Sequence, residues 1–182
     1  MTTPSVPSVP SDLQLRLRTI TDADVSDFSL KGMDCIGKVV DIYDGDTCKV
    51  VIIYKGEYAK FTCRLVGLDT PEMKPPMSKP NREEEIAAAK RCRNRFIQLA
   101  TNCRIDVGAL DISKKEIKAM MNDNSKLVRV VCGEFDKYGR LLVSLYDMAI
   151  PMNGGGNEKS YNSILVEENY AKPYYGGTKD AF

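Results

Sequence analysis

The stretch RLVGLDTPE, residues 64–72, places an arginine before an apolar run and two carboxylates after it. The run Leu65–Leu68 has the length and composition of a buried strand. Pro71 has no backbone N–H and disfavours helical geometry at the residue before it, so we expect this strand to end there. Asp69 and Glu72 then lie where a strand opens into a loop, a position where functional groups are often presented. Taken alone, the stretch fits a strand, a turn and solvated charges better than a functional site, so its neighbours decide the interpretation.

The residues before this stretch predict a three-stranded antiparallel meander. Strands are expected at residues 37–43, 48–54 and 58–68. The turn dipeptides Asp44-Gly45 and Lys55-Gly56 join them. Counting back from the second turn places Cys48 opposite Cys63, which is close enough for a disulfide. Because we expect a reducing compartment, we favour two small core residues that face each other.

The residues after the stretch predict helices and further strands. Residues 73–81 hold three prolines and should form a loop. Asn81 with Glu84, and Ser113 with Glu116, have the spacing of capping boxes that start two helices, the second ending near Met121. Strands are expected at residues 103–110, 126–133 and 140–146, a turn at 136–139, a flexible loop at 153–157 and a helix at 161–170.

The helix that starts after Asn81 has two predicted faces. Apolar residues recur at helical spacing and should face the core: Ile86, Ala89, Phe96, Ile97 and Ala100. Basic residues fall mostly between them and should form a solvated face: Lys90, Arg91, Arg93 and Arg95.

The expected strands in meander-plus-return order, with a helix between the third and fourth, predict an α+β, mainly β fold. It is a five-stranded OB-fold barrel with two to three helices. We assign residues 35–175 to this domain, residues 1–34 to an N-terminal arm and residues 176–182 to a short tail. The first part of the arm is rich in proline and serine and should be disordered. Residues 12–31 fit either a strand or a short helix, and we expect them to pack on the outside of the domain.

The composition of the chain excludes several classes of site. The 182 residues carry a formal charge of only +1, so any positive surface that binds nucleic acid must be local. The absence of histidine excludes histidine metal sites and a histidine general base. The six cysteines form no C-x-x-C pair, which argues against structural zinc. Neither a signal peptide nor a membrane span is visible, so we expect an intracellular protein with reduced thiols.

Three polar segments occur together on this strand pattern: DGDT at residues 44–47, RLVGLDTPE at 64–72 and DKYGR at 136–140. With them, residues 37–175 resemble the staphylococcal nuclease (thermonuclease) family in both charged and apolar positions. That resemblance implies an OB-fold barrel and a calcium-dependent nuclease. Such an enzyme hydrolyses phosphodiester bonds of DNA and RNA with little sequence specificity and leaves 3′-phosphates.

By the same resemblance, the metal ligands are the carboxylates of Asp46 and Asp69 and the backbone carbonyl of Thr70. Hard divalent cations prefer such oxygen ligands, and calcium is expected, with magnesium or manganese as alternatives. The resemblance makes Glu72 the general base or the group that orients the attacking water. With no histidine in the chain, a carboxylate is the only plausible base near the metal.

The resemblance also assigns residues to the substrate. Arg64 and Arg140 would clamp the phosphate, because a guanidinium pairs with two oxygens and stays charged. Lys137 and Tyr138 would touch the neighbouring phosphate, and either Tyr174 or Tyr175 would stack on a base. We expect DNA and RNA as partners, no membrane contact and a monomer. The alternative functions are a non-catalytic OB-fold module that binds nucleic acid or protein, and a purely structural barrel.

Overall fold

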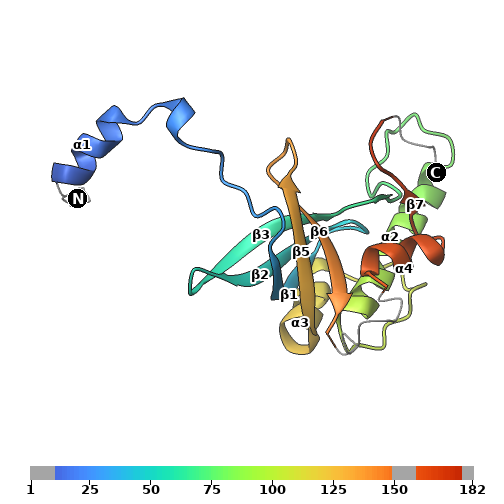
Figure 1. The fold of residues 1–182 in the computed structure, drawn as a ribbon. Coiled ribbons are helices and arrows are strands. Elements are labelled where there is room, and N and C mark those ends of the chain that lie inside the picture. Colours follow the sequence, from blue (N-terminus) through green and yellow to red (C-terminus); the bar gives the residue numbers. More distant parts are fainter. Residues whose placement is uncertain (1–10, 149–158, 178–182) are drawn as a thin grey trace, which may run out of the picture.

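The centre of the protein is a closed barrel with the strand order β1-β2-β3-β6-β5 (Figure 1). The computed structural model describes residues 11–148 and 159–177. The barrel strands are β1 (Asp34–Ile42), β2 (Thr47–Tyr54), β3 (Glu57–Leu65), β5 (Leu127–Phe135) and β6 (Leu141–Asp147). The predicted α+β fold with a five-stranded OB-type barrel is therefore confirmed.

The meander has the register that the turn residues predict. In β2 and β3, Tyr54 pairs with Glu57 and Cys48 pairs with Cys63 across the antiparallel ladder. Lys55 and Gly56 form the turn with φ of 51° and 84°, the left-handed geometry that two-residue hairpins require. Both cysteines are buried and free, which confirms that they act as small core residues.

The third strand is shorter than predicted. β3 ends at Leu65 instead of Leu68, and the chain turns at Val66-Gly67, where Gly67 has a φ of 81°. After this turn, Leu68 and Asp69 form the separate strand β4 (Leu68–Asp69), which pairs with β7 (Lys172–Pro173) outside the barrel. The break follows from the glycine, whose positive φ lets the chain leave the barrel at this point.

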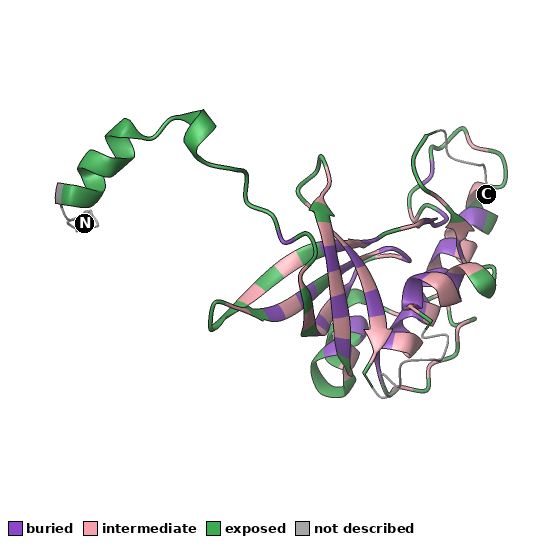
Figure 2. Ribbon diagram, in the orientation of Figure 1, coloured by how far each residue is buried: buried purple, intermediate pink, exposed green. Residues whose placement is uncertain are grey.

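Barrel closure depends on one parallel pairing between β3 and β6. Cys63 pairs with Leu141, Arg64 with Leu142, and Leu65 with Val143. Because β6 begins directly after Arg140, this register brings the start of β6 beside the end of β3. Buried residues alternate with less buried ones along the strands (Figure 2), as expected for a filled barrel.

Four α-helices lie in the described part of the chain: α1 (Ser11–Thr19), α2 (Arg82–Ala100), α3 (Lys114–Asn124) and α4 (Tyr161–Glu167). Helix α1 belongs to the N-terminal arm, so the described part of the barrel domain has three helices, in agreement with the two to three predicted. Helices α2 and α4 lie side by side next to the barrel (Figure 1). Most of the predicted core face of α2 is buried, namely Ala89, Phe96, Ile97 and Ala100, whereas Ile86 is half-buried. Arg93, predicted to be solvated, is instead buried with 5% of its surface exposed.

Two local predictions are wrong for reasons that the structure makes clear. Asn81 precedes α2 in a left-handed conformation with φ of 58°, so its side chain does not cap the helix. Residues 103–110 form turns and coil instead of a strand. There the buried side chain of Asn94 donates to the carbonyls of Val107 and Ala109, at 3.2 and 2.7 Å. These hydrogen bonds take the place of those that a neighbouring strand would make to the same carbonyls. The capping box of Ser113 with Glu116 at the start of α3 is present.

Helix α4 ends at Glu167, earlier than predicted, because Asn169 adopts a left-handed φ of 61°. The predicted loop at residues 153–157 and the predicted disordered start of the arm at residues 1–10 lie outside the described residues.

The N-terminal arm stands away from the barrel, which contradicts the expectation that it packs on the domain (Figure 1). All residues from 12 to 29 are exposed, and α1 lies in this exposed part (Figure 2). The arm joins the domain at Leu30, which is buried, and at Phe28, whose ring contacts Tyr54 and Phe135 at 5.8 and 6.0 Å between centroids. None of the helices in the described residues has the length and apolar character that crossing a membrane requires.

Candidate active site

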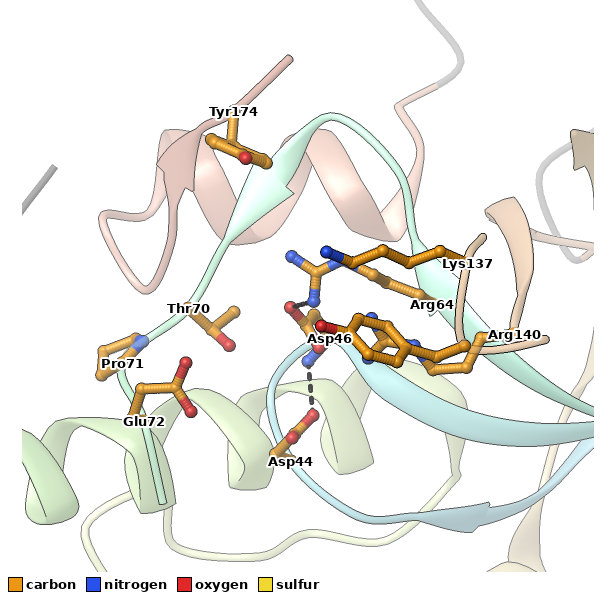
Figure 3. Close-up of a pocket in the computed structure, with 10 residues that line it drawn as sticks. Asp44, Asp46, Arg64, Thr70, Pro71, Glu72, Lys137, Arg140 and Tyr174 are labelled. Carbon is orange, nitrogen blue, oxygen red and sulfur yellow. Dashed lines mark hydrogen bonds and ion pairs between the residues drawn. The ribbon is translucent and has the colours of Figure 1, made fainter. Parts of the chain in front are cut away.

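The strand register collects three polar segments at one rim of the barrel. Thr47 pairs with Arg64 across β2 and β3, and Arg64 pairs with Leu142 across β3 and β6. Residues far apart in the sequence therefore share one pocket of about 410 Å³ (Figure 3). Its lining residues are Asp44, Asp46, Arg64, Thr70, Pro71, Glu72, Lys137, Tyr138, Arg140 and Tyr174.

The turn between β1 and β2 is shaped by Asp44, a residue that the sequence analysis did not assign to the site. Its Oδ1 accepts hydrogen bonds from the backbone N–H groups of Asp46, at 3.1 Å, and Thr47, at 2.7 Å. This is an Asx turn, and an aspartate followed by a glycine is the signal that could have indicated it. The turn fixes Asp46 at the pocket, where only 4% of its surface is exposed.

Arg64 lies between the two predicted metal-binding carboxylates. Its Nη1 forms an ion pair with Oδ2 of Asp46, and its Nη2 lies 3.3 Å from Oδ1 of Asp69. The same Nη2 donates to the carbonyl of Leu68 at 3.2 Å. Asp69 is buried behind Arg64 and does not line the pocket. One guanidinium thus offsets the charge of two buried carboxylates.

Arg140 is positioned by two groups that the sequence analysis did not single out. Its Nε donates to Oδ2 of Asp136 at 2.8 Å, and its Nη1 donates to Oγ1 of Thr47 at 3.3 Å. Burial would raise the pKa of Asp136, but hydrogen bonds from the N–H groups of Arg140 and Tyr138, and from the guanidinium, hold it below its ordinary value. Within the turn DKYGR, the carboxylate of Asp136 therefore fixes the orientation of the Arg140 side chain towards the pocket.

Glu72 approaches the pocket from the loop that follows β4. Its side chain is exposed and points across the pocket, opposite Lys137 and Arg140 (Figure 3). Its backbone N–H donates to Oε1 of Glu85 at 3.2 Å, and Glu85 is itself buried and paired with Lys79 at 2.5 Å. The first turn of α2 therefore holds the loop that carries Glu72.

The structure separates the two candidate stacking tyrosines. Tyr174 lines the pocket, and its backbone N–H donates to the carbonyl of Gly67 at 3.0 Å. Tyr175 is 90% exposed and lies outside this pocket. Lys137 and Tyr138 both line the pocket, with Nζ of Lys137 5.1 Å from the centre of the Tyr138 ring. Of the two tyrosines, only Tyr174 is placed to contact a ligand in the pocket.

The side-chain oxygens at this rim are of the type that hard divalent cations prefer. Asp46 and Asp69 both face the same guanidinium, and Thr70 lines the pocket next to them. In residues 11–148 and 159–177, no three carboxylate or thiol side chains gather as a metal-binding group. Because Asp46 and Asp69 both pair with Arg64 in this structure, a cation held by these two carboxylates would take the place of the guanidinium. It would complete its coordination with a backbone oxygen and water, as calcium does readily.

No protein-family model and no curated protein sequence matches this chain, so the likeness to the nuclease family rests on the motifs quoted above.

The buried position of Asp46 leads to a prediction about stability. Burial, and then the nearby charge of Asp44, raise the pKa of Asp46 to about 6, although Arg64 acts in the opposite direction. A raised carboxyl pKa means that the folded state binds the proton more tightly than the unfolded state. With chelator present, the contribution of Asp46 to stability should therefore increase as the pH falls from 7 towards 4.

Asp46→Asn should remove this pH dependence and raise the Tm at pH 7 in chelator. The expected rise is roughly 2–4 °C for each kcal/mol gained in a chain of this size. Thermal melts of both proteins between pH 4 and 7 measure the effect. A lower Tm for the variant at pH 7 would show that the ion pair with Arg64 outweighs the cost of burial.

Gly45 sets how closely the turn packs against helix α2. A Cβ at this position would lie 2.4 Å from Sγ of Cys92 and 2.9 Å from Cγ2 of Thr70. Gly45→Ala should therefore lower the free energy of unfolding by about 1–3 kcal/mol through overpacking. Denaturant unfolding measures the loss. Adding Cys92→Ala should restore part of it, because that change removes the nearer atom, and an equal loss in the double variant would contradict this account.

Proposed function

We propose that this protein is a divalent-cation-dependent nuclease that hydrolyses phosphodiester bonds of DNA and RNA. The observation that carries the proposal is the pocket at the barrel rim. It joins a buried carboxylate, two arginines and an exposed carboxylate, all drawn from three distant segments. Calcium is the expected cation, held by Asp46, Asp69 and the carbonyl of Thr70, with magnesium and manganese as alternatives.

The two arginines place positive charge next to the phosphate oxygens, on which negative charge develops during the reaction. A phosphate under attack by water gains negative charge on its oxygens, and fixed guanidinium groups stabilise that charge strongly in a partly buried site. Arg140 is held by Asp136 and Thr47, so little reorganisation is needed when substrate binds. Arg64 is held by Asp46 and would contact the phosphate from β3, the strand that pairs with β6. A bound cation would polarise a phosphate oxygen and lower the pKa of water.

Glu72 is placed to accept the proton of the attacking water. The water oxygen forms the new bond to phosphorus while the bond to the 5′ oxygen breaks. The leaving oxygen takes up a proton from solvent, so the products are a 3′-phosphate and a 5′-hydroxyl. A carboxylate on an exposed loop can take the proton and release it to solvent afterwards. Glu72 and Arg140 lie on opposite sides of the pocket, so a phosphate bound by Arg140 would face Glu72 across it (Figure 3).

The remaining pocket residues suit a substrate of any sequence. Lys137 and Tyr138 form a basic and aromatic edge beside Arg140, and Tyr174 offers a ring on which a base can stack. Stacking and phosphate contacts are tolerant of sequence, because every base has a flat face and every nucleotide a phosphate. An intracellular, monomeric enzyme is part of this proposal, and the six free cysteines accord with it.

The test is cleavage of single-stranded DNA, duplex DNA and RNA by purified protein with calcium, magnesium, manganese or chelator. We expect cleavage of all three substrates with calcium, loss of cleavage in chelator, and 3′-phosphate ends on the products. Absence of cleavage with every cation, together with salt-sensitive binding of the same nucleic acids, would favour a non-catalytic OB-fold binding module instead.

A further inference from the structure

A second pocket of about 460 Å³ lies beside the candidate active site, where β1 and β2 meet helices α2 and α3. Five cationic side chains and one carboxylate line it: Lys49, Lys74, Arg93, Lys114, Lys118 and Asp41. Asp41 pairs with Lys49 at 3.3 Å, which leaves the other four cations without an acidic group in the lining. In a chain whose net charge is only +1, this is a strong local excess of positive charge.

Arg93 is the buried member of this group. Only 5% of its surface is exposed, and burial lowers the pKa of its guanidinium. Its Nε and Nη2 donate to Oδ1 of the neighbouring Asn94, at 3.3 and 3.1 Å. Among the described residues, no carboxylate forms an ion pair with it. A buried guanidinium without a counter-charge is costly, and an anion in this pocket would offset that cost.

The two pockets follow each other along the same two segments of chain. Tyr43 lines the second pocket and Asp44 the first, while Glu72 lines the first and Met73 the second. Tyr43 is half exposed, and Nζ of Lys114 lies 5.9 Å from the centre of its ring. A nucleic-acid strand that extends from the first pocket into the second would therefore lie first against the ring of Tyr43 and then against several cationic side chains.

We propose that this second pocket is a phosphate subsite for a single nucleic-acid strand whose scissile phosphate lies in the first pocket. The inference rests on the proposed nuclease function and extends it to substrate length. Arg93 and Lys118 hold a phosphate beyond the point of cleavage, and Tyr43 faces the intervening nucleotide. Strands long enough to fill both pockets bind more tightly than a dinucleotide, which fills only the first.

Helix α3 offers a matched pair of variants. Lys118 lines the second pocket, whereas Lys115 is exposed on the same helix and does not line it. Binding of fluorescent dT12 and dT2 in chelator, where a cation-dependent enzyme cannot cleave, tests the subsite separately from catalysis. Lys118→Glu should weaken dT12 binding on the order of ten-fold at about 0.1 M salt and leave dT2 binding unchanged. Lys115→Glu should leave both unchanged.

Arg93→Met tests the buried cation through stability. In sodium chloride the variant should melt at or above the Tm of the original protein, because it removes an unpaired buried charge. At equal ionic strength, sodium phosphate should raise the Tm of the original protein and of Lys115→Glu by more than that of Arg93→Met. Equal phosphate effects in all three proteins would overturn the assignment of Arg93. If Arg93→Met does not fold, the Lys118 and Lys115 pair still decides the proposal.

Equal loss of dT12 affinity in Lys118→Glu and Lys115→Glu, or no loss in either, would overturn the subsite. Where cleavage is observed, Lys118→Glu should raise KM for dT12 with kcat unchanged. Cleavage with unaltered KM would overturn the subsite and leave the nuclease proposal standing. Binding that depends on Lys118 without any cleavage would support the subsite and refute the nuclease proposal.

Discussion

Glu72→Gln is expected to lower kcat for cleavage of single-stranded DNA by about 10²–10⁴-fold, the usual range for loss of a general base. The side chain is exposed and the variant keeps its shape, so the Tm should change little. Its backbone N–H still donates to Glu85, so the loop keeps its anchor. Because the lost interaction belongs to the transition state, kcat and kcat/KM should fall together.

Glu84→Gln is the matched control, since Glu84 is also an exposed glutamate near this loop but does not line the pocket. It should retain full activity. Full activity in Glu72→Gln as well would remove Glu72 from the mechanism, whatever the role of the cation.

Arg140→Lys is expected to lower kcat by about 10²–10³-fold, the cost of losing one fixed donor to a developing charge. Lysine keeps the charge but cannot reproduce a planar fork that bonds Asp136 through Nε and Thr47 through Nη1. The ion pair with Asp136 is partly exposed, so the loss of stability should be no more than about 1 kcal/mol. Steady-state kinetics and a denaturant titration separate the two effects.

Arg129→Lys provides the comparison, because Arg129 forms a similar ion pair with Asp34 on the barrel but does not line the pocket. It should lose little stability and no activity. Equal activity of Arg140→Lys and Arg129→Lys would show that charge alone, without the guanidinium geometry, is sufficient at position 140.

Local sequence signals were enough for the barrel strands and most turns. The dipeptide Lys55-Gly56 specified a two-residue hairpin, and the register of Cys48 opposite Cys63 followed by counting. Ser113 with Glu116 marked the start of α3 correctly. These features depend on interactions between residues only a few positions apart, so a short segment of sequence is enough to predict them.

Predictions failed where a distant group replaced a local partner. Residues 103–110 alternate well enough for a strand, but Asn94 on α2 donates to two of their carbonyls. None of the strands in the described residues pairs with them. The leucines of α1 lie on an exposed helix that does not pack on the domain. The charge of Arg93 predicts a surface position, but the packing of α2 buries this side chain.

The sequence by itself determined where the barrel strands lie along the chain, most of the turns and the chemical character of the candidate site. Turn geometry and helix capping depend only on residues close together in the sequence. The motifs DGDT, RLVGLDTPE and DKYGR contain the charged residues of the candidate site. Only the tertiary structure decided which of those groups meet. The parallel pairing of β3 with β6 brings Arg64 beside the turn that carries Arg140, and the register of β2 places Asp46 against Arg64. The hydrogen bond from Arg140 to Thr47 joins residues 93 positions apart, and a closed barrel holds them together.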